Sequence, residues 1–195
     1  MSAYAVFFAC DDPSTNIFSS QQCLMKPQRS QLWLIAISTG YVTYDLGLCI
    51  LELGYTMKKG GDFIIHHVVG IIGALAVLVS GRFNVALSAG NLFSEWTSFP
   101  MNQRWRMIKH GQGEGVVYML VNAIFFFGYI AARVVFMLVL ILRNYQIQHQ
   151  FDIFSDPPFV STCAVISTVL QVGLYLIQVY WFKLIFGAFM RTLQG

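Results

Sequence analysis

Charged residues are scarce in this sequence, and their scarcity defines the class of protein. Of the 195 residues, only 11% are Asp, Glu, Lys or Arg, whereas 56% are hydrophobic. A soluble domain carries about 25% charged residues, because a surface in contact with water needs them. The deficit excludes a soluble globular protein and indicates an integral membrane protein. The length leaves room for one membrane domain and for no second folded domain.

Several functional signals are missing as well. The basic residues lie mostly between apolar runs, so the sequence offers no continuous basic face and predicts no nucleic-acid partner. None of the four cysteines stands in a CxxC pair, and the sequence predicts neither a metal site nor a cofactor. A disulfide between Cys10 and Cys23 stays open if the N-terminus is lumenal. The N-terminus also lacks the basic region of a signal peptide.

Five apolar segments dominate what is present. A membrane span needs about 20 residues, because a helix must cross roughly 30 Å of hydrocarbon. The segments are residues 31–53, 62–80, 83–99, 115–142 and 159–188. The third is the shortest and most polar, and the polar residues 100–114 after it are predicted to be a connection. We expect an all-α, multi-pass transmembrane helical bundle of about five spans.

This pattern divides the chain into three parts and suggests an orientation. We expect an N-terminal segment at 1–30, a membrane domain at 31–190 and a short tail at 191–195. More basic residues fall on one membrane side than on the other, and the cytosolic side usually carries the excess. The tail is therefore predicted to be cytosolic and the N-terminus lumenal or external. The richer side holds Lys58, Lys59, Arg104, Arg106, Lys109 and Arg191, against Lys26, Arg29, Arg82 and Arg143 on the other.

Ionisable residues inside the spans are functional-site candidates, because each costs a few kcal/mol near the bilayer centre. His66 and His67 are neighbours on a predicted helix, so their side chains point about 100° apart. One can face a cavity while the other contacts a carboxylate or a carbonyl. A neutral imidazole suits general-base or acyl-accepting chemistry. The alternative is a pair of interfacial histidines solvated by lipid headgroups.

Depth connects the histidines to two carboxylates. Asp45 and Glu95 are predicted at a similar level on the same membrane side as His66, so packing of the first three spans would join them in a polar cavity. Asp45 has an equally simple alternative role as a structural hydrogen-bond group. Arg133 is expected toward the opposite face, with its side chain extending to the interface.

Other polar and small residues are predicted to join helices. Amide groups within spans usually form interhelical hydrogen bonds, and small residues at four-residue spacing allow a helix to approach closely. Asn91 lies beside such a stripe and is expected to meet the neighbouring helix directly. The amides are Asn122, Gln171 and Gln178, and the stripe is Ala86, Gly90 and Ser94.

Three stretches together resemble the TLC-domain family of membrane proteins. They are YDLGLCI at 44–50, DFIIHHVVGIIGAL at 62–75 and SEWTSFPMNQRW at 94–105, within a resemblance that covers about residues 30–190. The resemblance implies an all-helical membrane domain concerned with lipid synthesis, sensing or homeostasis. It favours the endoplasmic reticulum, with the plasma membrane as the alternative. Family members usually have one or two further N-terminal spans, which leaves a shortened form open.

The site residues follow from this resemblance together with the depth argument. In ceramide synthases the paired histidines belong to the N-acylation site, and those positions match His66 and His67, the candidate catalytic residues. Ceramide synthases also carry a downstream His-Asp pair followed by a Ser-Asp pair, where this chain reads AGNLFSEWTS. The departure weakens the case for acyl transfer. The predicted polar residues of the lipid cavity are Asp45, Asn91, Glu95, Asn102 and Arg104.

Three functions are compared. The first is a protein of lipid homeostasis that binds or senses an acyl lipid, either a sphingolipid or a phospholipid, in an intramembrane cavity. The second is an acyl-CoA-dependent N-acyltransferase that uses the histidine pair. A small transporter or channel ranks last, because the sequence lacks paired, broken helices in repeated halves. The expected partner is a membrane lipid or acyl chain, with acyl-CoA added for an enzyme, and the sequence does not fix the oligomeric state.

Overall fold

We used a computed structural model, which describes residues 16–18, 26–81, 84–150 and 157–194. The described residues are mostly helical, and an isolated β-bridge joins Thr56 to Lys59. The all-α prediction is therefore confirmed. The elements are α3 (Arg29–Leu51), α4 (Gly61–Ser80), α5 (Asn84–Leu92), the 3-10 helix η1 (Phe93–Thr97), α6 (Ser98–Lys109), α7 (Val116–Tyr129), the π-helix η2 (Ile130–Phe136), α8 (Met137–Gln150) and α9 (Pro158–Gln194).

Four helical stretches are long and apolar enough to cross a membrane. They correspond to four of the five predicted segments and confirm a multi-pass bundle. They are Arg29–Leu51, Gly61–Ser80, Val116–Gln146 and Pro158–Met190. Side chains on their outer faces are largely apolar and exposed, as expected where lipid replaces water.

The third predicted segment, residues 83–99, differs from its prediction. It consists of α5 and η1, and the chain then continues directly into α6 instead of ending in a connection. The 3-10 turn forms where Ser94 Oγ donates to the Asn91 carbonyl (2.7 Å) and Thr97 Oγ1 donates to the Ser94 carbonyl (2.9 Å). Such back-bonding to the residue three positions earlier matches the tighter 3-10 spacing.

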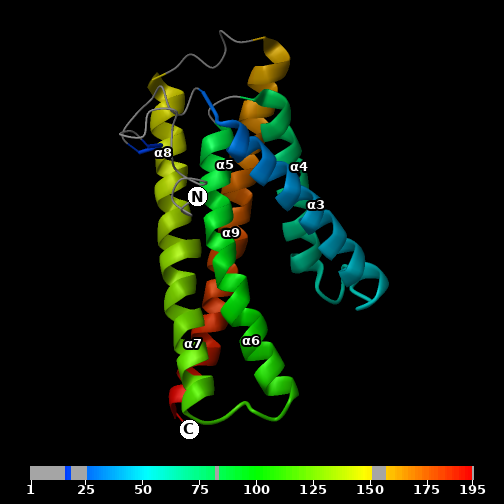
Figure 1. The fold of residues 1–195 in the computed structure, drawn as a ribbon, viewed down its shortest axis with the longest axis vertical. Coiled ribbons are helices and arrows are strands. Elements are labelled where there is room, and N and C mark those ends of the chain that lie inside the picture. The colour runs from blue at the N-terminus through cyan, green and yellow to red at the C-terminus, as the bar shows by residue number, and fades with distance from the viewer. Residues whose placement is uncertain (1–15, 19–25, 82–83, 151–156, 195) are drawn as a thin grey trace.

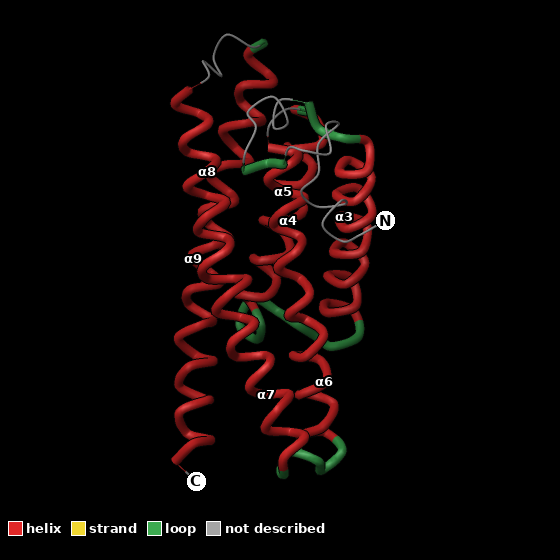
Figure 2. Tube along the Cα trace, turned by 60° about the vertical axis from the view of Figure 1, so that its left-hand side comes forward, coloured by secondary structure: helices red, strands yellow, loops and turns green. Residues whose placement is uncertain are grey.

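The helices lie roughly along one axis in the bundle (Figures 1 and 2). The α3–α4 hairpin forms one side, the long α7–η2–α8 stretch and α9 form the other, and α5 to α6 run between them. The α6–α7 loop and the C-terminus lie at one end, and the end of α8 and the start of α9 lie at the opposite end. The turn between α3 and α4 points toward the end that holds the C-terminus.

Small residues let α5 approach α8 closely. Ala86 is fully buried, and a Cβ added at Gly90 would lie 3.4 Å from Leu140 of α8 and 3.5 Å from Ile17. The structure confirms the role predicted for the stripe. A buried apolar cluster packs the α3–α4 hairpin against α5. The cluster contains Ile35, Val77, Val85 and Ala89.

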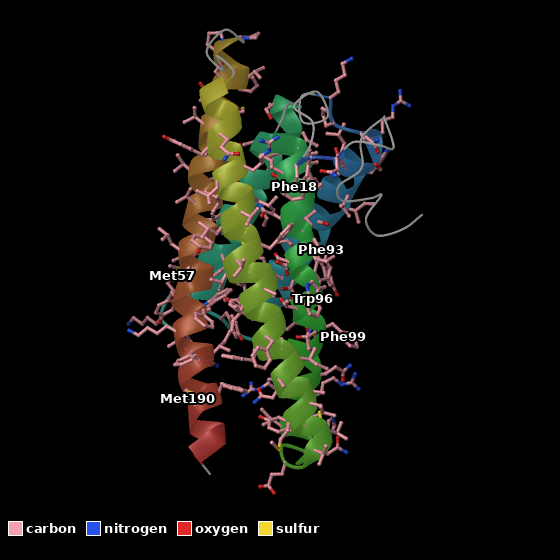
Figure 3. All side chains as sticks on the ribbon, turned by 90° about the vertical axis from the view of Figure 1, so that its left-hand side faces the viewer. Phe18, Met57, Phe93, Trp96, Phe99 and Met190 are labelled. Atoms are coloured by element: carbon pink, nitrogen blue, oxygen red, sulfur yellow. The ribbon has the colours of Figure 1, made fainter. Side chains whose placement is uncertain are left out.

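An aromatic stripe runs along η1 into α6. Phe93, Trp96 and Phe99 follow at intervals of three, and Figure 3 shows them one below another. This interval equals one turn of a 3-10 helix. The Phe93 ring meets that of Phe136 in η2 at 5.9 Å between centroids. The stripe thus fixes η1 against the π-helix, which carries the principal cation of the site.

Candidate functional site, an intramembrane polar cluster

His67 is held by two acceptors, one from each helix of the α3–α4 hairpin. Its Nε2 lies 2.8 Å from Asp45 Oδ2, and its Nδ1 lies 2.9 Å from the Phe63 carbonyl oxygen. The side chain is buried, with 6% exposure. The Phe63 carbonyl oxygen can only accept, so Nδ1 is the donor of that bond, and Nε2 shares a proton with the Asp45 carboxyl group. Both ring nitrogens of His67 are therefore engaged in contacts within the protein.

The His66 ring lies edge-to-face with that of its neighbour His67, with 5.6 Å between centroids and 81° between planes, and the two rings have different partners. Its ring packs on Trp181 of α9, with 5.1 Å between centroids. The Trp181 indole is fixed in turn, because its Nε1 donates to Asp62 Oδ2 at 2.7 Å. His66 Nδ1 is buried, and no described residue hydrogen-bonds to it. His66 is thus the uncommitted imidazole of the pair.

A second charged pair lies between η1 and η2. Arg133 Nη2 donates to Glu95 Oε2 at 2.8 Å and to Ser98 Oγ at 3.0 Å, and Nε donates to Thr97 Oγ1 at 2.7 Å. Nη1 reaches Gln178 Oε1 of α9 at 3.3 Å. The expected extension of Arg133 to the opposite interface is therefore wrong. The side chain is 6% exposed and turned inward, where a carboxylate offsets its desolvation.

The π-helix explains this inward position. η2 interrupts the α-helical run between α7 and α8, and Arg133 lies at its middle. One extra residue per turn rotates the side chains that follow, and such bulges occur frequently at functional sites. Tyr129, just before η2, supports the network because its hydroxyl lies 2.6 Å from Gln178 Oε1. Arg133 and Tyr129 thus share one amide acceptor on α9.

The two charged pairs belong to one cluster. Glu95 and Arg133 are close enough to His66 to interact with it electrostatically. Tyr41 of α3 is similarly close to both Asp45 and Glu95. Two acids and one arginine thus surround the histidine pair, and each acid is already bonded to a basic partner. Among the described residues, His66 Nδ1 is the ring nitrogen of the pair that has no hydrogen-bond partner, and it can form one hydrogen bond with a bound molecule.

The structure also places the other predicted cavity residues. Asn91 is half-buried, and its buried Oδ1 has no hydrogen-bond partner among the described residues. Asn102 is exposed on α6. Arg104 lies elsewhere, where its Nε donates to Asn122 Oδ1 at 3.0 Å. The structure thus pairs Asp45 with His67, pairs Glu95 with Arg133, and places Arg104 in a separate contact.

The predicted interhelical amides all bridge helices. Asn122 joins α7 to α6, Gln178 joins α9 to η2 and α7, and Gln171 accepts from Asn144 of α8 at 3.1 Å. The sequence reading did not assign Thr97, Ser98 and Tyr129 to the site. The available signal was weak: the hydroxyls lie within the SEWTS motif, and Tyr129 precedes Arg133 by one turn.

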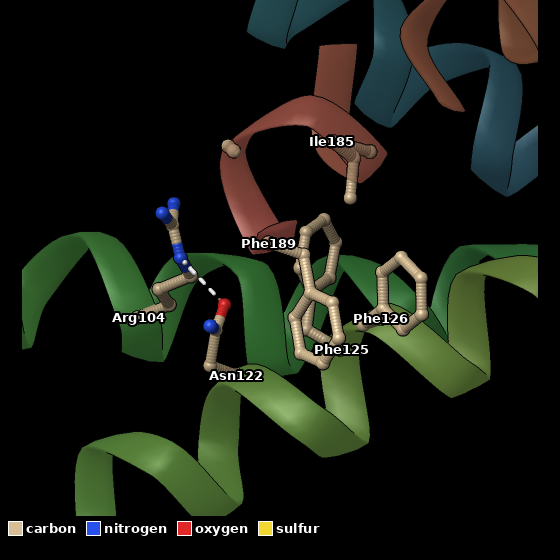
Figure 4. Close-up of a pocket in the computed structure, with 7 residues that line it drawn as sticks. Arg104, Asn122, Phe125, Phe126, Ile185 and Phe189 are labelled. Carbon is tan, nitrogen blue, oxygen red and sulfur yellow. Dashed lines mark hydrogen bonds between the residues drawn. The ribbon is translucent and has the colours of Figure 1, made fainter. Parts of the chain in front are cut away.

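Two pockets stand out in the described part of the chain, and neither is lined by the histidines. A cavity of about 50 Å³ lies between α6, α7 and α9 (Figure 4). It is lined by Arg104, Asn122, Phe125, Phe126, Ile185, Ala188 and Phe189. A wider hollow of about 380 Å³ lies at the start of α9, and its lining includes Pro158 and Ile166.

Comparison with known proteins gives one clear result. The family model described as TLC domain matches residues 1–187, nearly the whole chain. Searches of curated proteins and of solved structures found no significant match. The family match agrees with the three motifs that carry Asp45, the histidine pair and Glu95.

Proposed function

Because this chain belongs to the TLC-domain family of membrane proteins, we propose that it acts in membrane-lipid homeostasis by binding the polar part of an acyl lipid at His66. The observation that carries the proposal is the buried His66 Nδ1 without a partner. A buried polar atom left unbonded costs about 1–3 kcal/mol. A bound lipid that supplies the missing hydrogen bond recovers this free energy.

The surroundings favour an uncharged hydrogen-bonding group. Asp45 is bonded to His67 and Glu95 to Arg133, so both acids of the cluster are already compensated. A hydroxyl or amide of a sphingolipid or glycerolipid adds no further charge to the site. Its acyl chain would lie along the exposed apolar faces of the spans, where it displaces another lipid at little cost. The proposed compartment is the endoplasmic reticulum, to be checked by microscopy of the tagged protein.

One observation favours a second candidate, an N-acyltransferase. The open nitrogen of His66 stands beside an ordered histidine–carboxylate pair, an arrangement suited to a general base. In that reaction the amine nitrogen would attack the thioester carbonyl of acyl-CoA, and His66 would take the proton that the amine loses. The C–N bond forms, the C–S bond breaks and coenzyme A leaves as the thiol. His67 would serve as a positioning residue, because both of its nitrogens are engaged.

A single preparation separates the two functions. The protein is purified in a mild detergent as wild type, His66→Gln and the matched control His110→Gln, since His110 is exposed in the α6–α7 loop. Mass spectrometry then measures the co-purified lipid, and the product formed from a long-chain base and acyl-CoA.

The binding proposal expects a lipid retained by wild type and His110→Gln, lost from His66→Gln, and no amide product. Amide formation that disappears in His66→Gln would replace binding by the acyltransferase. Equal lipid retention in all three proteins would show that His66 is not the binding group.

A further inference from the structure

Arg104 presents a charge that no carboxylate in the described part of the chain compensates. It lies on α6, partly buried, and its Nε donates to Asn122 Oδ1 at 3.0 Å. That bond holds the guanidinium at the edge of the 50 Å³ cavity, with its two terminal nitrogens directed away from Asn122 (Figure 4). No carboxylate of the described residues forms an ion pair with it.

Comparison with Arg133 shows what is unusual about this site. Arg133 has Glu95 as a counter-charge and uses all three of its nitrogens in hydrogen bonds. Arg104 contributes the same charge to a cavity whose wall is mainly aromatic and aliphatic. Arg104 is half-buried, and among the described residues its one side-chain hydrogen bond uses Nε, so both terminal nitrogens remain available to a ligand. An anionic ligand would supply the missing partner.

The position of the cavity indicates where the anion comes from. Its lining residues come from α6, α7 and the C-terminal part of α9, and these helices lead to the end of the bundle that holds the α6–α7 loop and the C-terminus (Figure 1). Exposed basic residues and an exposed tryptophan occur on the same helix, and Lys109 Nζ lies 4.9 Å from the centre of the Trp105 ring. Tryptophan and basic residues together are typical of the headgroup level of a membrane.

We infer that the Arg104 cavity binds the phosphate of an anionic phospholipid headgroup. The two free guanidinium nitrogens form the fork that recognises phosphate oxygens in pairs. A cavity of about 50 Å³ has room for about four oxygen-sized atoms, enough for one phosphate group. The acyl chains would leave along Phe126 and Phe189, whose stacked rings line the cavity at 4.1 Å between centroids. This site is separate from His66 and does not depend on the proposed function.

The test measures binding of phosphatidylglycerol and phosphatidylcholine to the purified full chain by native mass spectrometry. Wild type is expected to prefer phosphatidylglycerol. Arg104→Met should weaken its binding about tenfold, because charge-assisted hydrogen bonds contribute about 1.5–3 kcal/mol and 1.4 kcal/mol equals a factor of ten. Arg106→Met, which removes an exposed charge from the same helix, should retain wild-type binding.

A second variant keeps the inference testable if Arg104→Met fails to fold. Asn122→Asp places a carboxylate against Arg104 without changing the size of the side chain, so it should neutralise the cation and weaken phosphatidylglycerol binding as strongly. Equal binding of both lipids, or no loss in either variant, would overturn the inference. Displacement of the lipid by millimolar inorganic phosphate would identify free phosphate as the ligand and overturn the lipid assignment. His66→Gln leaves Arg104 and Asn122 in place, so it should keep the preference for phosphatidylglycerol over phosphatidylcholine, and the two sites can be judged independently.

Discussion

At the residue scale, His67 and Asp45 are expected to be energetically coupled. The two side chains meet at 2.8 Å between α3 and α4, and His67 is buried. Asp45→Asn and His67→Gln should each lower the thermal unfolding midpoint in detergent. The double variant should lose less than the sum, by about 1–2 kcal/mol, as for residues in direct contact. Additive losses would show that the pair contributes nothing beyond its separate groups.

Arg133 should contribute more to stability than any exposed basic residue. Arg133→Met leaves Glu95, Thr97 and Gln178 without their common donor. Removing one partner of a fully buried ion pair costs about 3–5 kcal/mol. The Glu95 side chain is 50% exposed, so the pair is only partly buried and we expect a smaller loss of about 2–3 kcal/mol. Thermal unfolding of Arg133→Met beside Arg106→Met measures the difference, and equal midpoints would contradict the structural role.

These pairs show what depth and residue type can predict. A carboxylate partner for one histidine could be predicted from the level of Asp45, because helical rise converts sequence distance into depth, whereas the ion pair of Glu95 is with Arg133. The rotation of Arg133 could not, because the π-helix changes which face it occupies. A regular α-helix would place the Arg133 side chain on a different face. The sequence of residues 130–136 does not by itself predict a π-helix.

At the element scale, Pro100 explains why α6 is absent from the prediction. A proline is a helix breaker in a helix interior, and the polar residues after it favour a connection. Pro100 is the third residue of α6, in the first turn, where a backbone N–H needs no intrahelical partner. The helix therefore continues past the hydrophobic segment. Hydropathy alone could not predict this, because α6 is polar.

The contact between η1 and α7 should tolerate no side chain at Gly128. A Cβ there would lie 2.6 Å from the far edge of the Trp96 ring. Gly128→Ala must displace this ring, and with it the 3-10 turn that carries Glu95 and Thr97. We expect a loss of about 1–3 kcal/mol, as in other overpacked sites.

A double-variant cycle isolates this contact. In a Trp96→Ala background the added methyl group meets open space, so Gly128→Ala should cost little there. Thermal unfolding of the four proteins measures the coupling. An undiminished cost in the Trp96→Ala background would assign the effect to the helix backbone.

At the scale of the whole molecule, the arrangement of spans fixes which loops share a membrane side. The α3–α4 turn and the α6–α7 loop point toward the C-terminal end of the bundle, and α8 ends at the opposite end (Figure 1). Of the basic residues counted on the richer side, Lys58 and Lys59 lie in the α3–α4 turn, and the others lie in α6 (Arg104, Arg106 and Lys109) and near the end of α9 (Arg191). The structure thus supports placing these basic residues on one side of the membrane. The positive-inside rule predicts that this side is cytosolic.

Single cysteines test both the grouping and the orientation. Lys58→Cys, Gln112→Cys and Gln146→Cys place thiols at exposed positions, in a chain whose four native cysteines are replaced by serine. In sealed microsomes with the cytosolic face outward, an impermeant maleimide should label the first two and spare the third until detergent is added. Labelling of Gln146→Cys alone would invert the orientation and keep the fold. Labelling of Lys58→Cys without Gln112→Cys would contradict the helix arrangement itself, because the α3–α4 turn and the α6–α7 loop would then lie on opposite sides.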